Sequence, residues 1–129
     1  MTQTKFINAL VVDDSSLNRL VIVEYLKGKD VHITEAEDGE QALEKIAAEK
    51  PDVILLDLIM PVMDGFEVLE ILKKQENKIP VIVITAYLKG NTFQRCKELG
   101  AKGFLNKPVK MQELFSLLSQ IIEQNTPSE

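Results

Sequence analysis

The sequence predicts an α/β fold, a doubly wound sheet of five parallel strands with five helices on its two faces. Three features of the 129 residues support this prediction. Strand-like runs alternate with helical patterns five times. The first, third and fourth runs are continuously apolar, which is typical of strands that are covered on both faces. The connections are short, as expected where crossover helices pack back onto a single sheet.

The strand-like runs differ in how they distribute apolar residues. Within the run 31–36, residues 31–35 alternate, which predicts an edge strand with one face in water. The continuous runs instead predict central strands. In chain order, the predicted strands are 7–12, 31–36, 53–56, 81–84 and 103–106.

Capping residues mark the first three helices. Ser15 or Ser16 can cap a helix that runs to about Lys27, and Gly28 ends it. The segments 38–41 (Asp-Gly-Glu-Gln) and 64–67 (Asp-Gly-Phe-Glu) resemble capping boxes. The residues expected to face the core are Ala42, Leu43, Ile46 and Ala47 in the second helix and Leu69 and Leu72 in the third.

The last two helices are bounded by polar residues. Asn91 is expected to cap a short helix, with Gly100 just past its end. The polar residues 124–129 are expected to fray, so the chain is predicted to be a single domain, 1–129, with its core at about 6–123. The inward residues are expected to be Phe93, Cys96 and Leu99 in the fourth helix, and Met111, Leu114, Leu117, Leu118, Ile121 and Ile122 in the last.

The overall composition narrows the classes of function. The formal net charge of −5 disfavours direct binding to nucleic acid. No apolar stretch approaches about 18 residues, so no membrane span is expected. Cys96 is the one cysteine, which excludes an intrachain disulfide and agrees with a reducing compartment. The first residues lack the features of a secretion signal, so a cytoplasmic protein is expected.

Polar side chains follow the apolar runs at the point where each run ends. Asp13 and Asp14 follow the first run, Asp57 the third and Thr85 the fourth, and Lys107 follows the last. In an open parallel sheet, ligands bind outside the carboxyl ends of the strands. The sequence therefore predicts that three carboxylates, one hydroxyl and one ammonium gather at one edge of the sheet.

The three carboxylates favour a magnesium site, with manganese as an alternative. Negative charges in one pocket repel each other, and a hard divalent cation relieves the repulsion. Calcium requires more oxygen ligands, and softer metals require histidine or cysteine; His32 is expected on the edge strand and Cys96 within a helix. Taken singly, the acids have other interpretations. Asp13 and Asp14 could be a helix cap and a first-turn acid, and Asp57 a turn residue.

Thr85 and Lys107 fit a phosphoryl group held on Asp57, although each has an ordinary alternative. A threonine at a strand end is commonly a strand residue, and a lysine there commonly extends into solvent. Pro108 follows Lys107, and this type of peptide bond can be cis. A cis bond would direct the ammonium over the edge of the sheet. Together the two groups would neutralise and hydrogen-bond a phosphoryl group.

These motifs resemble the receiver domain (CheY-like) of two-component response regulators, over essentially the whole chain. The matching segments are 11–15 (Val-Val-Asp-Asp-Ser), 57–65 (Asp-Leu-Ile-Met-Pro-Val-Met-Asp-Gly), 85–86 (Thr-Ala) and 107–108 (Lys-Pro). The spacing of Asp57, Met-Pro and Asp-Gly in the second segment is highly specific. The resemblance implies a flavodoxin-like sheet in the strand order 2-1-3-4-5.

The resemblance also implies a role for each acid. Asp57 would be the phosphoryl acceptor and a magnesium ligand. Asp14 would bind magnesium directly, Asp13 largely through water, and Ile59 through its backbone carbonyl. Lys107 would contact the phosphoryl oxygens. The implied donor is a histidine kinase or a histidine phosphotransfer protein.

The switch implied by the resemblance uses Thr85 and Phe104. Thr85 would move towards the phosphoryl group, and Phe104 would rotate inward to fill the vacated space. A downstream protein would detect the change on the face built by the fourth helix, the fifth strand and the last helix. Ile59 and Tyr87 could tune the lifetime of the phosphorylated state. Ile59 cannot orient a water molecule, which predicts slow self-hydrolysis; the alternative is that both residues merely pack at the rim.

The expected function is a phosphorylation-controlled switch that catalyses only its own phosphorylation and dephosphorylation. The chain ends soon after its last helix, so no appended output domain is expected; a fragment of a longer regulator or hybrid kinase is the variant. A magnesium-dependent phosphohydrolase would need a substrate pocket and a second acid beside Asp57. A receiver-like module that is never phosphorylated would usually lack an acid or the lysine. A flavodoxin-like nucleotide binder would need a glycine-rich loop after the first strand.

Overall fold

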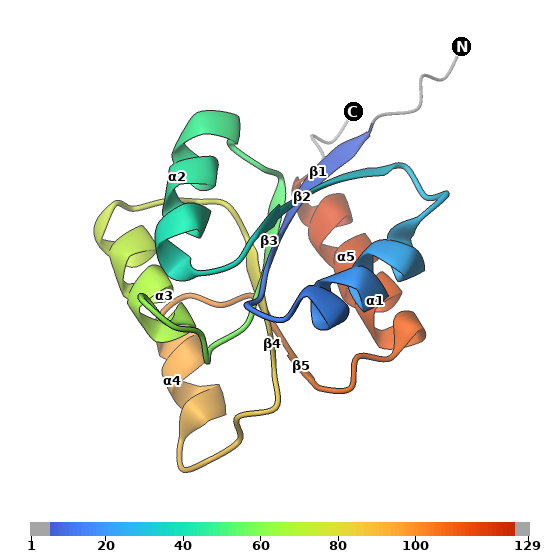
Figure 1. Cartoon of the computed structure of the whole chain (residues 1–129). Helices are drawn as coiled ribbons and strands as arrows, with labels where there is room; N and C mark the ends of the chain where they lie inside the picture. Colours follow the sequence, from blue (N-terminus) through green and yellow to red (C-terminus); the bar gives the residue numbers. More distant parts are fainter. Residues whose placement is uncertain (1–5, 126–129) are drawn as a thin grey trace.

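The computed structural model describes residues 6–125, and Figure 1 shows one central sheet between two layers of helices. All neighbouring strands pair in parallel, in the order β2-β1-β3-β4-β5. The predicted doubly wound fold is therefore confirmed. The strands are β1 (Ile7–Val12), β2 (Val31–Ala36), β3 (Val53–Leu56), β4 (Val81–Thr85) and β5 (Gly103–Asn106). The boundary that differs is at the end of β4, because Thr85 pairs with Asn106 and so belongs to the strand.

The helices are divided between the two faces of the sheet. Helices α1 and α5 cover one face, and α2, α3 and α4 cover the other (Figure 1). Within residues 6–125, no helix is both long enough and apolar enough to cross a membrane. The helices are α1 (Ser16–Leu26), α2 (Gly39–Glu49), α3 (Gly65–Lys74), α4 (Thr92–Glu98) and α5 (Met111–Asn125).

Helix α5 extends two residues into the segment that was expected to fray. A polar tail was expected from residue 124, but α5 continues to Asn125, so Gln124 and Asn125 are helical. The backbone can continue its hydrogen-bonded pattern for two residues beyond the expected end, because an existing helix adds a residue without a new nucleation step. Residues 126–129, the rest of the predicted tail, lie outside the described residues.

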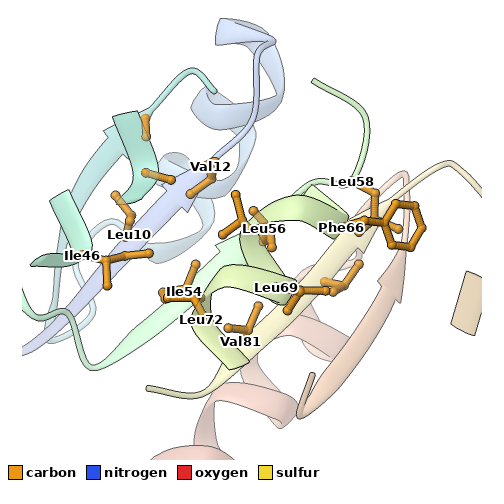
Figure 2. Close-up of a cluster of buried hydrophobic side chains, with 14 of the residues drawn as sticks. Leu10, Val12, Ile46, Ile54, Leu56, Leu58, Phe66, Leu69, Leu72 and Val81 are labelled. Atoms are coloured by element: carbon orange, nitrogen blue, oxygen red, sulfur yellow. The ribbon is translucent and has the colours of Figure 1, made fainter. Parts of the chain in front are cut away.

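Two apolar layers hold the strands rigidly. Because side chains alternate across a strand, Leu10, Ile54 and Leu56 point to the α2–α3 side, where Figure 2 shows them with Ile46 and Leu69. The residues between them in sequence pack on the other side against α1 and α5. Full burial of such a side chain contributes roughly 1.5–3 kcal/mol. The strand ends that carry the polar residues are therefore fixed by a core on each face.

Helix caps agree with the sequence in part. Ser15 caps α1 by accepting from the Asn18 N–H at 3.2 Å. At α3 both bonds of the predicted capping box form, between Asp64 and Glu67. At α2 the cap bond from Gln41 N–H to Asp38 forms, but the Gln41 side chain accepts from the Glu37 N–H instead, one residue before the cap.

Helix α4 departs furthest from the expected pattern. Asn91 occupies the cap position but its side chain makes no cap hydrogen bond. Phe93 was expected inside; it is 57% exposed, and its ring packs edge-to-face on Phe104 with centroids 5.3 Å apart. The reason is topological: β5 is the last strand of the sheet, so no further strand lies beneath this side of the helix. Ala47 and Met111, also expected inside, are exposed at the margins of α2 and α5.

Candidate functional site

The register of the sheet places two acids on neighbouring strands. Val12 pairs with Leu56, so the residues that follow them, Asp13 and Asp57, leave β1 and β3 at the same level. The Asp57 N–H donates to the Val12 carbonyl at 2.9 Å, and the Asp13 N–H donates to the Ala36 carbonyl at 3.1 Å. Both aspartates are thus held by sheet-like backbone bonds at the carboxyl ends of neighbouring strands.

Asp14 completes a cluster of three carboxylates. One oxygen from each of Asp13, Asp14 and Asp57 lies within 4.8 Å of the others. Asp13 and Asp57 are 3% and 6% exposed, whereas Asp14 is open to solvent. Carboxylate oxygens are hard ligands, and a group with one open side leaves room for the waters and phosphate oxygens that magnesium prefers. The donor set therefore fits a hard divalent cation.

Lys107 contacts two of these acids, Asp13 and Asp57, through its ammonium. Its Nζ lies 2.6 Å from Asp13 Oδ2 and 3.2 Å from Asp57 Oδ2, and its side chain is 17% exposed. The Lys107–Pro108 peptide bond is cis, and the Lys107 N–H donates to the Thr85 carbonyl at 3.0 Å. This hydrogen bond ties the ends of β4 and β5 together, with the ammonium directed at the carboxylates.

Burial and charge pull the pKa values at this site in opposite directions. Burial raises the pKa of Asp57, the charge of Lys107 lowers it, and the charge of Asp13 raises it again; the net shift is upward. Burial lowers the pKa of Lys107, but its hydrogen bond to Asp13 and the charges of Asp57 and Asp13 outweigh burial, so that pKa is raised. The neighbouring carboxylates therefore favour the charged form of Lys107, whereas burial makes ionisation of Asp57 costly.

Thr85 is 1% exposed at the end of β4. Its hydroxyl oxygen accepts from the Tyr87 N–H at 3.2 Å, and the hydroxyl is among the groups that lower the pKa of Asp57. The structure therefore brings together the predicted Asp13, Asp14, Asp57, Thr85 and Lys107.

The other predicted residues lie at the margins of this cluster. Ile59 is 52% exposed in the connection from β3 to α3. Tyr87 is 36% exposed and packs edge-on against Phe66 with ring centroids 6.4 Å apart. Phe104, in β5, pairs with Val83 of β4, which lies two residues before Thr85. Its ring is partly buried against the α3–α4 side of the core and contacts Phe93.

Sequence reasoning missed two residues that shape the site. Gly65 was noted within a capping box and in the Asp-Gly pair of segment 57–65, without a structural role; a Cβ here would collide with the Asp57 carbonyl oxygen and would lie 2.8 Å from Leu58 Cα. Only glycine allows α3 to begin against the backbone of Asp57. Arg19 donates from its guanidinium to the Asp13 carbonyl oxygen at 2.6 Å. A sequence signal exists for Gly65, as part of the Asp-Gly pair of segment 57–65, but none pointed to Arg19.

Known proteins resemble this chain over most of its length. The profile of the family described as "Response regulator receiver domain" matches residues 9–119. Sporulation initiation phosphotransferase F of Bacillus subtilis is 37% identical over 105 residues, which are 81% of this chain and 85% of that protein. The chain spans between 6% and 53% of the length of three other curated relatives that it matches.

Solved structures agree with the sequence comparisons. The signal receiver domain of a LuxO repressor protein from Vibrio parahaemolyticus superposes with a TM-score of 0.88 at 28% identity, over 92% of each chain. A chain of the CheX-CheY-BeF3-Mg+2 complex from Borrelia burgdorferi superposes with a TM-score of 0.82 at 30% identity, over 90% of this chain and 89% of that one.

Proposed function

The chain belongs to the response regulator receiver domain family, and we propose that it is a signalling switch controlled by phosphorylation of Asp57. The observation that carries the proposal is the setting of the Asp57 carboxylate. It is buried at the end of a central strand, beside Asp13, and lies 3.2 Å from the Lys107 ammonium. A carboxylate that is costly to ionise and lies next to a fixed cation suits a nucleophile that must receive an anionic group.

Magnesium, or manganese, is the proposed cofactor. Asp14 would bind it directly, Asp13 largely through water, and Asp57 and the backbone carbonyl of Ile59 would complete the protein ligands. The ion would neutralise charge on the transferring phosphoryl group. The three carboxylate oxygens within 4.8 Å of one another support this assignment. The similar complex from Borrelia burgdorferi is named for its BeF3 and magnesium.

Transfer would proceed by in-line displacement at phosphorus. An Asp57 carboxylate oxygen forms the new O–P bond, the bond from phosphorus to the donor imidazole nitrogen breaks, and its electron pair stays on that nitrogen. Leu58 N–H donates to Asp57 Oδ1 at 2.8 Å, whereas Oδ2 faces Lys107. After transfer the Lys107 ammonium would contact the negatively charged phosphoryl oxygens, and Thr85 would donate a hydrogen bond to one of them.

The switch would depend on contacts that only the phosphorylated state makes. The Thr85 hydroxyl now accepts from Tyr87 N–H, at the start of the connection to α4. Turning that hydroxyl to a phosphoryl oxygen breaks the bond and frees the connection to move. Phe104 would then turn inward and leave Phe93. Ligands shift an equilibrium only through such differential contacts.

The proposed output surface is the α4–β5–α5 face. A hollow of about 490 Å³ on this face is lined by Leu88, Phe93, Phe104 and Glu113, among others. Movement of Phe93 and Phe104 would reshape it, so a downstream protein that contacts the hollow would distinguish the two states. The proposed phosphodonor is a histidine kinase or a histidine phosphotransfer protein.

Intact mass spectrometry tests the proposal. The protein is incubated with a small phosphodonor, such as phosphoramidate, and with Mg²⁺. We expect the mass of one phosphoryl group to be added, and Asp57→Asn to abolish the addition. The same adduct on the Asn variant, or no adduct on the wild type, would contradict the proposal. Continuous release of phosphate from added phosphate esters would instead indicate a phosphohydrolase.

A further inference from the structure

Arg19 connects the acidic cluster to the edge strand through two different nitrogens. Its Nη1 donates to the Asp13 backbone carbonyl at 2.6 Å, and its Nε donates to Glu35 Oε1 at 2.8 Å. The Arg19 side chain is 11% exposed and that of Glu35 48%. Glu35 belongs to β2 and pairs with Val11, so the guanidinium spans the gap between α1 and the ends of β1 and β2.

The Asp13 carbonyl that Arg19 holds is part of the peptide group joining Asp13 to Asp14. The side chains of Asp13 and Asp14 leave the backbone on either side of that peptide group. Its orientation therefore affects the direction in which both carboxylates point. Asp13 has other anchors: its N–H bonds to Ala36, and its carboxylate accepts from Ser15 N–H at 2.9 Å and from Lys107. The hydrogen bond from Arg19, by contrast, is made to the carbonyl oxygen of this peptide group itself.

We propose that Arg19 is a positioning residue for the divalent cation, which it does not touch. By holding the Asp13 carbonyl, it sets the direction in which the exposed Asp14 carboxylate leaves the end of β1. Glu35 neutralises the guanidinium, so the clamp adds little positive charge that would oppose a cation. The proposal rests on the proposed function, since it takes the three aspartates as the cation site. Groups that orient metal ligands typically affect affinity by about 10- to 100-fold.

The direction of the effect separates positioning from simple electrostatics. Replacing Arg19 by methionine removes a positive charge near three carboxylates, which by Coulomb's law should strengthen cation binding. Loss of positioning should weaken it. We expect Arg19→Met to weaken Mg²⁺ binding about tenfold. Arg19→Lys keeps the charge but cannot present two nitrogens in the same fixed geometry, so it should give an intermediate affinity.

The test is calorimetric titration of the purified protein with MgCl₂, repeated with Mn²⁺ followed by electron paramagnetic resonance. Urea unfolding in EDTA reports the folding of each variant. The matched control is Arg95→Met, because Arg95 also pairs with a carboxylate, that of Glu70 at 3.3 Å, but on the α3–α4 surface. Its Mg²⁺ affinity should equal that of the wild type.

Each outcome bears on a different statement. Unchanged or tighter Mg²⁺ binding by folded Arg19→Met and Arg19→Lys would overturn the role of Arg19 and leave the cation site intact. Weaker binding by Arg19→Met, with Arg19→Lys equal to wild type, would support positioning through the Asp13 carbonyl and overturn the need for the two-nitrogen geometry of arginine. A wild-type protein that binds neither Mg²⁺ nor Mn²⁺ would overturn the cation site and, with it, the role of Arg19.

Discussion

Replacing Lys107 by methionine should destabilise the protein in the absence of divalent cations. The change leaves Asp13 and Asp57, both nearly buried, without the ammonium that lies 2.6 and 3.2 Å from them. Hydrogen bonds to charged groups contribute about 1.5–3 kcal/mol each. Because the Lys107 side chain is 17% exposed and water can reach part of the site, we take the lower value for both bonds. The expected loss in the free energy of unfolding is about 3 kcal/mol at pH 7.

The assay is urea unfolding, followed by circular dichroism, in EDTA and in excess Mg²⁺. Mg²⁺ supplies positive charge to the same carboxylates without competition from the ammonium, so the variant should bind Mg²⁺ more tightly than the wild type. The wild type is also stabilised by Mg²⁺, but a variant with the lower dissociation constant gains more, so the difference in unfolding free energy between the two proteins should narrow in excess Mg²⁺. Lys27→Met is the matched control, because that side chain is 74% exposed and its ion pair with Glu24 is 3.9 Å long.

Two results would refute this reasoning. An unfolding free energy equal to that of the wild type in EDTA would mean that the two short contacts carry no net stability. A loss of the same size with and without Mg²⁺ would mean that the carboxylates do not share a cation site with the ammonium.

Four further predictions concern Asp57 and the segment that follows it, up to Gly65. Ile59→Asn should accelerate loss of the phosphoryl group at least several-fold, since an amide can orient water and the 52% exposed isoleucine cannot; equal decay rates by intact mass would count against it. Gly65→Ala should cost about 3 kcal/mol in urea unfolding, because the clash with the Asp57 backbone disrupts the Gly65–Leu58 hydrogen bond and the two bonds of the capping box, each about 1 kcal/mol. Gly103→Ala is its control, because the Cβ would meet side chains and no backbone, those of Leu117 at 3.1 Å and Ile82 at 3.4 Å. Val62→Asn should stabilise by about 1 kcal/mol, because Val62 has a φ of 69° and is 74% exposed, and asparagine tolerates that conformation; a lower unfolding midpoint would contradict this. Folding raises the pKa of Asp57, so the stability that its protonated carboxyl contributes is present below the ordinary aspartate range and is lost as pH rises through the folded pKa. In EDTA, Asp57→Asn should therefore be more stable than the wild type at pH 7, and the difference should vanish in acid.

The fold was predictable because local patterns and tertiary burial agree. The central strands are continuously apolar, and both of their faces are covered by helices. Asp57 was predictable for a related reason: a charged residue directly after such a run must leave the core at the edge of the sheet. Lys107 was predictable because it directly follows β5, which ends at the same edge.

The remainder depends on contacts between distant parts of the chain. Periodicity placed Phe93 inside, but the sheet ends at β5, and a helical pattern does not indicate how far the sheet extends beneath it. The contact between Arg19 and the Asp13 carbonyl joins a side chain to a backbone atom, which leaves no complementary residue type to recognise. The clash that excludes a Cβ at Gly65 likewise involves only backbone atoms of Asp57 and Leu58.

The most direct measurement identifies which residue carries the phosphoryl group. The protein is phosphorylated with phosphoramidate and Mg²⁺ and treated with borohydride, which reduces an aspartyl phosphate to homoserine, and its peptides are then sequenced by mass spectrometry. The proposed mechanism predicts homoserine at position 57 and nowhere else. Reduction at Asp13 or Asp14 with Asp57 unchanged, or a phosphoryl group found on a hydroxyl or a nitrogen, would contradict it.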